Sequence, residues 1–249
     1  MRLAHFLRGS AAAVALSASL AGTASAQVLH DNGPVVPPSG PSVIRAGGTM
    51  FGAGMQTNGP NRVADDFTVA VAGGWNVTGF SFFGYQTFSN SAFTFTGLSW
   101  SIVAGDVNTG SIVASGSVVP TNGGLVGYRT TASTLSNQDR AIFQIDADVP
   151  DFTLGVGSYW LQWSVAGSLA AGPFQPPTSD GAVGNAQQKL GSANFGNLLD
   201  AGDASGVELP FIIRGTAAST VVPEPSTWSM MVVGGLAMVV LARRRRRID

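Results

Sequence analysis

Short runs of alternating apolar and polar residues dominate the chain between residues 42 and 216. In a β-strand, alternate side chains lie on opposite faces, so this pattern predicts strands that are buried on one side. The clearest run has an apolar residue at every second position: Tyr159, Leu161, Trp163 and Val165. Further strands are expected around Phe67, Val69 and Val71; residues 75–85; Leu98, Trp100 and Ile102; residues 112–119; Phe143, Ile145 and Ala147; and Leu209, Phe211 and Ile213. Weaker candidates lie at residues 49–55 and 125–131.

Helical periodicity is almost absent from this region, and its 33 glycines over the full chain supply turns, such as Gly73 and Gly74. About nine short strands separated by turns predict an all-β fold, a single β-sandwich domain over residues 42–216. Residues 27–41, rich in Pro and Gly, are expected to form an irregular N-terminal arm, and residues 217–222 a linker.

Residues 166–207 break the strand pattern with a long stretch rich in Gly, Pro, Ser and Asn. A loop of that length in a compact domain is functional or contains short strands that the pattern does not reveal. Residues 186–190 favour one such strand.

The first 26 residues have the organisation of a signal peptide. Arg2 and Arg8 give a positive start, and residues 11–21 form an apolar core. The small residues Ala24 and Ala26 then form a cleavage site, so the mature chain is expected to begin at Gln27. The alternative is a permanent N-terminal anchor, for which the apolar core is short.

The C-terminus contains an apolar run at residues 226–242 with no charged side chain, followed by arginines. Its 17 residues are close to the shortest length that spans a bilayer as a helix. Each arginine costs roughly 2.5–3.5 kcal/mol at the centre of a span, so the cluster is expected to stop transfer. The cluster consists of Arg243, Arg244, Arg245, Arg246 and Arg247. The alternative, a buried core helix, would leave five arginines without partners.

Residues 223–249 resemble the PEP-CTERM sorting signal of Gram-negative bacteria in having a short motif, an apolar helix and a terminal arginine cluster in that order. The motif residues are Pro223, Glu224, Pro225, Ser226, Thr227 and Trp228. The resemblance covers about a tenth of the chain. It implies processing by an exosortase, a membrane-embedded cysteine protease, near residues 223–225. It also implies delivery, through an inner-membrane intermediate, to the cell surface or extracellular matrix, often alongside exopolysaccharide.

A second resemblance extends over most of the mature chain. Its residues are 64–68, 74–75, 79–85, 159–163 and 209–215. These segments are similar to a set of exported bacterial domains that often carry the same tail. The resemblance implies a β-sandwich with jelly-roll-like packing and brings no activity with it.

Removing the two targeting ends changes the charge of the protein. The full chain has a formal net charge of −1, whereas residues 27–222 hold six Lys and Arg against twelve Asp and Glu, about −6. An acidic domain argues against nucleic acid as a partner. The absence of cysteine excludes disulfides and thiolate chemistry within the chain.

Histidine is too scarce for most catalytic or zinc sites. His5 is expected to leave with the signal peptide, and His30 lies in the arm, whereas a catalytic triad needs a sheltered imidazole. Glycoside hydrolysis needs two nearby carboxylates, but Asp65 and Asp66 are adjacent in a strand and so face opposite sides. The sequence therefore predicts no catalytic residues, and a glycan hydrolase or lyase is the least favoured alternative.

Calcium and sugar binding remain open. Asp146, Asp148 and Asp151 cluster at a strand end, and carboxylate oxygens suit calcium, although turn-forming aspartates give the same pattern. No other cofactor is expected.

Aromatic side chains supply the candidate ligand contacts. Trp160 alternates out of phase with its apolar neighbours, and Phe174 and Phe195 lie in the long irregular stretch. The sequence predicts a non-enzymatic surface or matrix protein, with a carbohydrate-binding module as the alternative.

Overall fold

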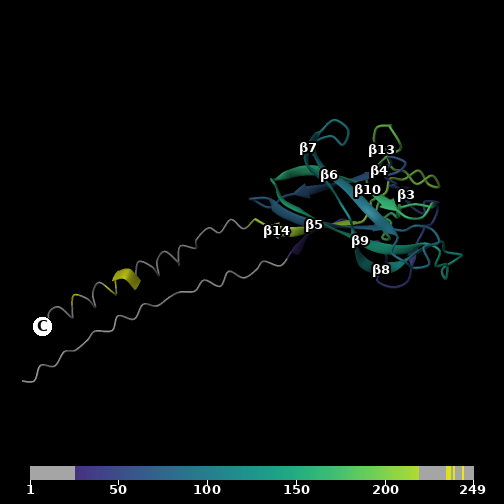
Figure 1. Cartoon of the computed structure of the whole chain (residues 1–249), viewed down its shortest axis with the longest axis horizontal. Coiled ribbons are helices and arrows are strands. Elements are labelled where there is room, and N and C mark those ends of the chain that lie inside the picture. Colours follow the sequence, from purple (N-terminus) through teal and green to yellow (C-terminus); the bar gives the residue numbers. More distant parts are fainter. Residues whose placement is uncertain (1–25, 219–233, 237, 239–242, 244–249) are drawn as a thin grey trace, which may run out of the picture.

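A computed structural model of the chain describes residues 26–218, 234–236, 238 and 243. The fold is all-β, which confirms the expected class, and its strands form two six-stranded curled sheets and one two-stranded sheet (Figure 1). The first sheet has the order β1 (Gln27–Asp31), β14 (Phe211–Ala217), β5 (Trp75–Gly84), β9 (Ala141–Leu154), β8 (Thr121–Thr130) and β2 (Ser42–Val43). The second has the order β13 (Gly196–Asn197), β12 (Gln187–Lys189), β4 (Arg62–Val69), β10 (Gly157–Gly167), β6 (Phe95–Ala104) and β7 (Ser111–Val118).

The core lies between the inner faces of these two sheets. Phe80 and Phe82 of β5 meet Trp100 of β6 and Trp163 of β10, with ring centroids 5.0 Å apart in each pair. Phe211 of β14 adds a third large ring, 5.8 Å from Trp163. Alternation predicted these inward positions because only one face of each strand meets the other sheet.

The β4–β5 turn shows why glycine is required at one position. Gly74 has a φ of +80°, and a Cβ there would lie 2.0 Å from the carbonyl oxygen of Leu154. The turn also corrects one expected core residue. β4 ends at Val69, so Val71 lies beyond the strand and is exposed.

Residues 27–31 differ from the irregular arm that was expected over residues 27–41. Gln27–Asp31 forms β1, which pairs antiparallel with β14. The expectation was wrong because the partner strand is distant in sequence and its hydrogen bonds, rather than local alternation, hold β1. His30 consequently packs against the rings of Phe67 and Phe211, at 5.9 and 5.2 Å.

The long stretch at residues 166–207 contains short strands. β12 confirms the strand expected at residues 186–190, and β13 and β11 (Phe174–Gln175) were not expected. β11 pairs with β3 (Ala53–Gly54) to form the two-stranded sheet. Most of this stretch nevertheless runs as loops, which cover one part of the second sheet's outer face.

Candidate functional site

The outer face of the second sheet carries rows of polar side chains across neighbouring strands. Gln162 of β10 lies opposite Ser101 of β6, whose hydroxyl donates to Gln162 Oε1 over 3.1 Å. In the next row, Ser99 of β6 and Ser117 of β7 share a 2.8 Å hydrogen bond. Hydroxyl and amide groups on a strand face are held at fixed spacings by the ladder. Gln162 and Ser101 are buried, so the accessible hydroxyls of these two rows are those of the half-buried Ser99 and the exposed Ser117.

One hollow on this face lies over β6 and β7. It measures about 350 Å³ and is lined by Arg62, Ser99, Ser101, Ser115 and Ser117, among others. Trp100 also borders it, although its indole packs in the core against Phe80. Trp100 Nε1 is buried and has no hydrogen-bond partner in the part of the chain that the structure describes. Gly116 is needed here because a Cβ would lie 3.2 Å from the indole edge.

A second hollow, of about 210 Å³, adjoins the first at Ile112. Phe195 and Lys189 line one side of it. Asn108 joins the two loops that border the hollow, donating to the Phe195 carbonyl over 3.1 Å and accepting from the Phe195 N–H over 2.8 Å. The hollow is therefore bordered by loops with fixed positions.

Two of the three aromatic residues proposed for ligand contact lie on this face. Trp160 is half-buried on the outer face of β10, opposite Asp66 of β4 and Val103 of β6, and Val103 also lines the second hollow. Phe195 lines the hollow itself. Phe174 lies elsewhere, 5.5 Å from the ring of Tyr85 in a separate apolar cluster. Its role is packing, because β11 places it against β5.

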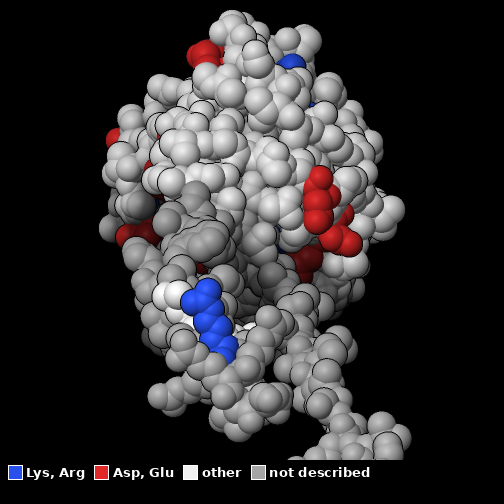
Figure 2. All heavy atoms as spheres, turned by 90° about the vertical axis from the view of Figure 1, so that its left-hand side faces the viewer, with Lys and Arg blue, Asp and Glu red and all other residues white. Residues whose placement is uncertain are grey.

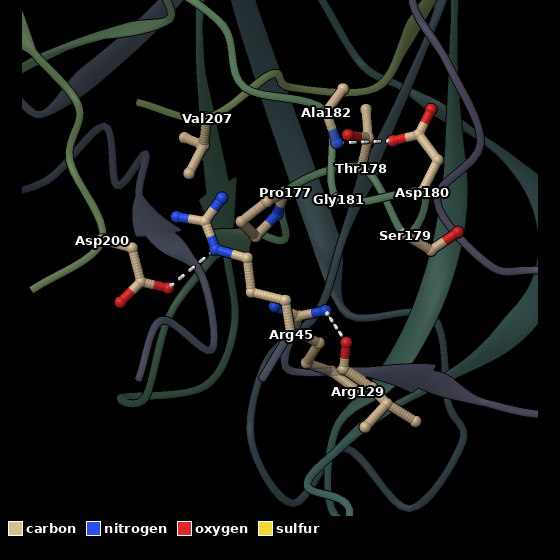
Figure 3. Close-up of a pocket in the computed structure, with 11 residues that line it drawn as sticks. Arg45, Arg129, Pro177, Thr178, Ser179, Asp180, Gly181, Ala182, Asp200 and Val207 are labelled. Carbon is tan, nitrogen blue, oxygen red and sulfur yellow. Dashed lines mark hydrogen bonds and ion pairs between the residues drawn. The ribbon is translucent and has the colours of Figure 1, made fainter. Parts of the chain in front are cut away.

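A more enclosed pocket of about 160 Å³ lies near the 43–49 loop (Figure 3). Arg129 lines it and is buried. Its guanidinium donates to four acceptors: the carbonyls of Val43, Met50 and Phe51, and the hydroxyl of Ser42. Burial lowers the pKa of Arg129 to about 10. Its hydrogen bonds hold the 42–51 segment in place, which is a structural task.

Asp200 also holds the 42–51 segment in place, from the other side of the pocket. Its carboxylate accepts from the N–H groups of Thr49, Met50 and Gly202 at 2.7–3.2 Å. Burial opposes its charge, but these hydrogen bonds prevail and the pKa of Asp200 is lowered. Arg45, drawn between them in Figure 3, pairs with Asp203 at 2.8 Å and lies 3.9 Å from Asp200. The charged groups of this pocket are thus largely occupied in joining loops.

Asp65 forms an interaction that the sequence did not indicate. It faces the core, fully buried, and accepts from the N–H of Leu209 at 2.7 Å. Asn32 donates to both Asp65 and Glu208, at 3.0 and 3.1 Å. Burial, together with the hydrogen bond and charge of Glu208, raises the pKa of Asp65 to about 9. This carboxyl pair retains a proton at neutral pH, but Asp65 has no exposed surface from which to deliver it to a substrate.

The three aspartates proposed for calcium lie along β9. Asp146 accepts from Ser81 at 2.6 Å and from Gln144 at 2.8 Å, while Asp148 and Asp151 are exposed. Within residues 26–218 and the other described positions, no three His, Asp or Glu side chains come together to hold a metal ion. Calcium binding therefore stays a prediction from the sequence.

Several predictions concern residues outside the described part of the chain. These are the signal peptide with Ala24, the sorting motif at residues 223–228, and Arg244 to Arg247. Ala26 and Gln27 are described, as is Arg243, which is helical. No helix among the described residues is long and apolar enough to cross a membrane, so the span at residues 226–242 remains a prediction.

Comparison with known families identifies the C-terminus. Residues 221–247 match the PEP-CTERM protein-sorting motif. No curated protein and no solved structure matches the chain. The motif implies export and exosortase-dependent sorting to the surface. The chain thus carries a PEP-CTERM protein-sorting motif at residues 221–247, which is consistent with an exosortase substrate.

Proposed function

We propose that the exported domain is a non-enzymatic surface or matrix protein that contacts extracellular polysaccharide through the outer face of its second sheet. The observation that supports this proposal most is that Trp160 and Phe195 lie on the same face as two hollows, one lined by Ser99, Ser115 and Ser117 and the other by Asn108. Sugars offer an apolar ring face and many hydroxyls, so aromatic planes beside fixed hydrogen-bonding groups suit them.

The strand order supports a jelly-roll-like sandwich as the framework for this face. β4, β10, β6 and β7 lie side by side, and the chain crosses to the other sheet between β4 and β6 and again between β7 and β10. In the opposite sheet, β9 lies between β5 and β8 and pairs with both. The two hollows on the outer face of this sheet of β4, β10, β6 and β7 are the openings that the framework offers to a ligand.

Substitution of the two aromatics tests the proposal. Trp160→Ala and Phe195→Ala are each expected to weaken binding of the mature protein to the host's purified exopolysaccharide by roughly 0.5–1.5 kcal/mol, because each removes a stacking surface. Isothermal titration calorimetry measures the change. Phe88→Ala is the matched control, because Phe88 is also an exposed aromatic but lies in the turn after β5. A wild-type protein that binds no exported polysaccharide would contradict the proposal.

Processing is tested separately. Mass spectrometry of the mature protein is expected to find Gln27 at the N-terminus and to find no peptide from residues 229–249. The domain is compatible with the first cut, since β1 begins at Gln27 and stays intact. Recovery of peptides that include residues 243–247 from surface protein would mean that the tail is a permanent anchor.

A further inference from the structure

Two basic residues lie directly opposite each other on the proposed polysaccharide face. In the antiparallel pair of β4 and β12, Arg62 is the partner of Lys189. Like charges at opposed positions of a sheet repel and destabilise the pairing. This placement is notable in a domain that has only six basic residues and a net charge of about −6.

Neither cation has an acidic partner within the described part of the chain. The ion pairs among residues 26–218 are those of Arg45 with Asp200 and Asp203. Arg62 donates one side-chain hydrogen bond, to the Ser101 hydroxyl over 3.3 Å. A guanidinium has five N–H groups, so most of its donors stay free for a ligand. Arg62 is also half-buried, and that burial lowers its pKa.

The two cations also border the two hollows. Arg62 lines the hollow over β6 and β7, and Lys189 lines the one beside Phe195. A carboxylate placed between them would relieve their repulsion and accept hydrogen bonds from a guanidinium in bidentate geometry. Figure 2 shows acidic side chains at several separate places on the face that it draws, and an anion would be repelled at those places.

We propose that the polysaccharide bound by this face is acidic, with Arg62 and Lys189 binding the carboxylate of a uronic acid residue. This inference rests on the proposed function and names its ligand class. Trp160 and Phe195 supply the contact that any sugar could use, and the two cations select for charge. Ser99, Ser115 and Ser117 then face the sugar hydroxyls along the chain of the polymer, while the buried Ser101 accepts a hydrogen bond from Arg62.

A pair of polymers that differ only in charge tests the inference. Polygalacturonate and its fully methyl-esterified form share one backbone, but only the first carries carboxylates. The mature protein is expected to bind polygalacturonate at least about fivefold more tightly than the ester. The preference should shrink when sodium chloride rises from 20 to 300 mM, roughly, because salt screens exposed charges.

Variants distinguish binding of the sugar polymer from preference for its acidic form. Arg62→Gln/Lys189→Gln is expected to lose the preference for polygalacturonate while keeping the affinity for the ester. The control, Arg140→Gln/Arg214→Gln, changes the net charge equally but lies away from this face, with Arg140 over the Phe51 ring and Arg214 bonded to Ser81. It should keep the preference, and circular dichroism verifies that both variants are folded.

The possible failures are distinguishable. If both polymers bind equally and Trp160→Ala abolishes that binding, the face is a sugar site but the choice of an acidic ligand is wrong. If the control variant loses the preference as much as Arg62→Gln/Lys189→Gln does, the effect comes from net charge and the assignment to these two residues is wrong. If neither polymer nor the host polysaccharide binds, the proposed function fails and the inference fails with it.

Discussion

Replacing Trp163 by alanine is expected to lower the free energy of unfolding by about 3–5 kcal/mol. The side chain is fully buried between the sheets, with its ring 5.0 Å from Phe82 and 5.8 Å from Phe211. Its Nε1 also donates to Gln175 Oε1 over 3.3 Å. The variant therefore has both a cavity and a buried amide oxygen without that donor. Urea denaturation followed by circular dichroism measures the loss.

Trp160→Ala provides the comparison on the same strand. Trp160 is half-buried on the outer face, so its removal opens no cavity between the sheets. A cost of no more than about 1 kcal/mol is expected. Similar urea midpoints for the two variants would mean that the inner and outer faces of β10 are wrongly assigned.

The stability of the domain is expected to fall as the pH rises from about 4 to 9, because of Asp65. The pKa of Asp65 is raised to about 9 in the folded state by burial and by Glu208, whereas the unfolded chain has an ordinary value of 3.8. Below pH 4 both states hold the proton, so this carboxyl costs nothing. Above it the unfolded state ionises first, which favours unfolding by at most about 1.4 kcal/mol per pH unit until the folded pKa is reached.

Asp65→Asn should remove this component of the pH dependence. An asparagine cannot ionise, but it can still accept from Leu209 and Asn32 and donate to Glu208. The variant is therefore expected to melt at a higher temperature than the wild type at pH 8, with the difference shrinking toward pH 4. Asp66→Asn, the neighbour on the opposite face, is the control. A wild-type melting temperature that is constant from pH 5 to 8.5 would contradict the role of Asp65.

Alternation predicted the central strands well because each has one face buried by the other sheet. β5, β6, β9 and β10 lie where the sequence indicated, and their large apolar residues form the core. β7 was also expected, but Ile112 and Val113 are exposed, since this strand is the edge of its sheet. Periodicity reveals a strand but does not reveal whether anything covers it.

The polar surface could be predicted only in part. Trp160 was found because it is out of phase with its neighbours, a signal contained within one strand. The pairing of Arg62 with Lys189, and of Asp65 with Glu208, joins residues that are far apart in the sequence and depends on which strands become neighbours. The spacing of residues within one strand does not show which strands become neighbours. For the same reason it did not predict β1.

The pairing of β1 with β14 brings together the first and the last strand of the described domain. β1 is the first described strand in the sequence, and among the described strands it pairs only with β14, the last. The match to the sorting motif starts at residue 221, four residues beyond Ala217. The sheet edge formed by β1 can therefore be completed only when β14, which ends four residues before the sorting motif, is present.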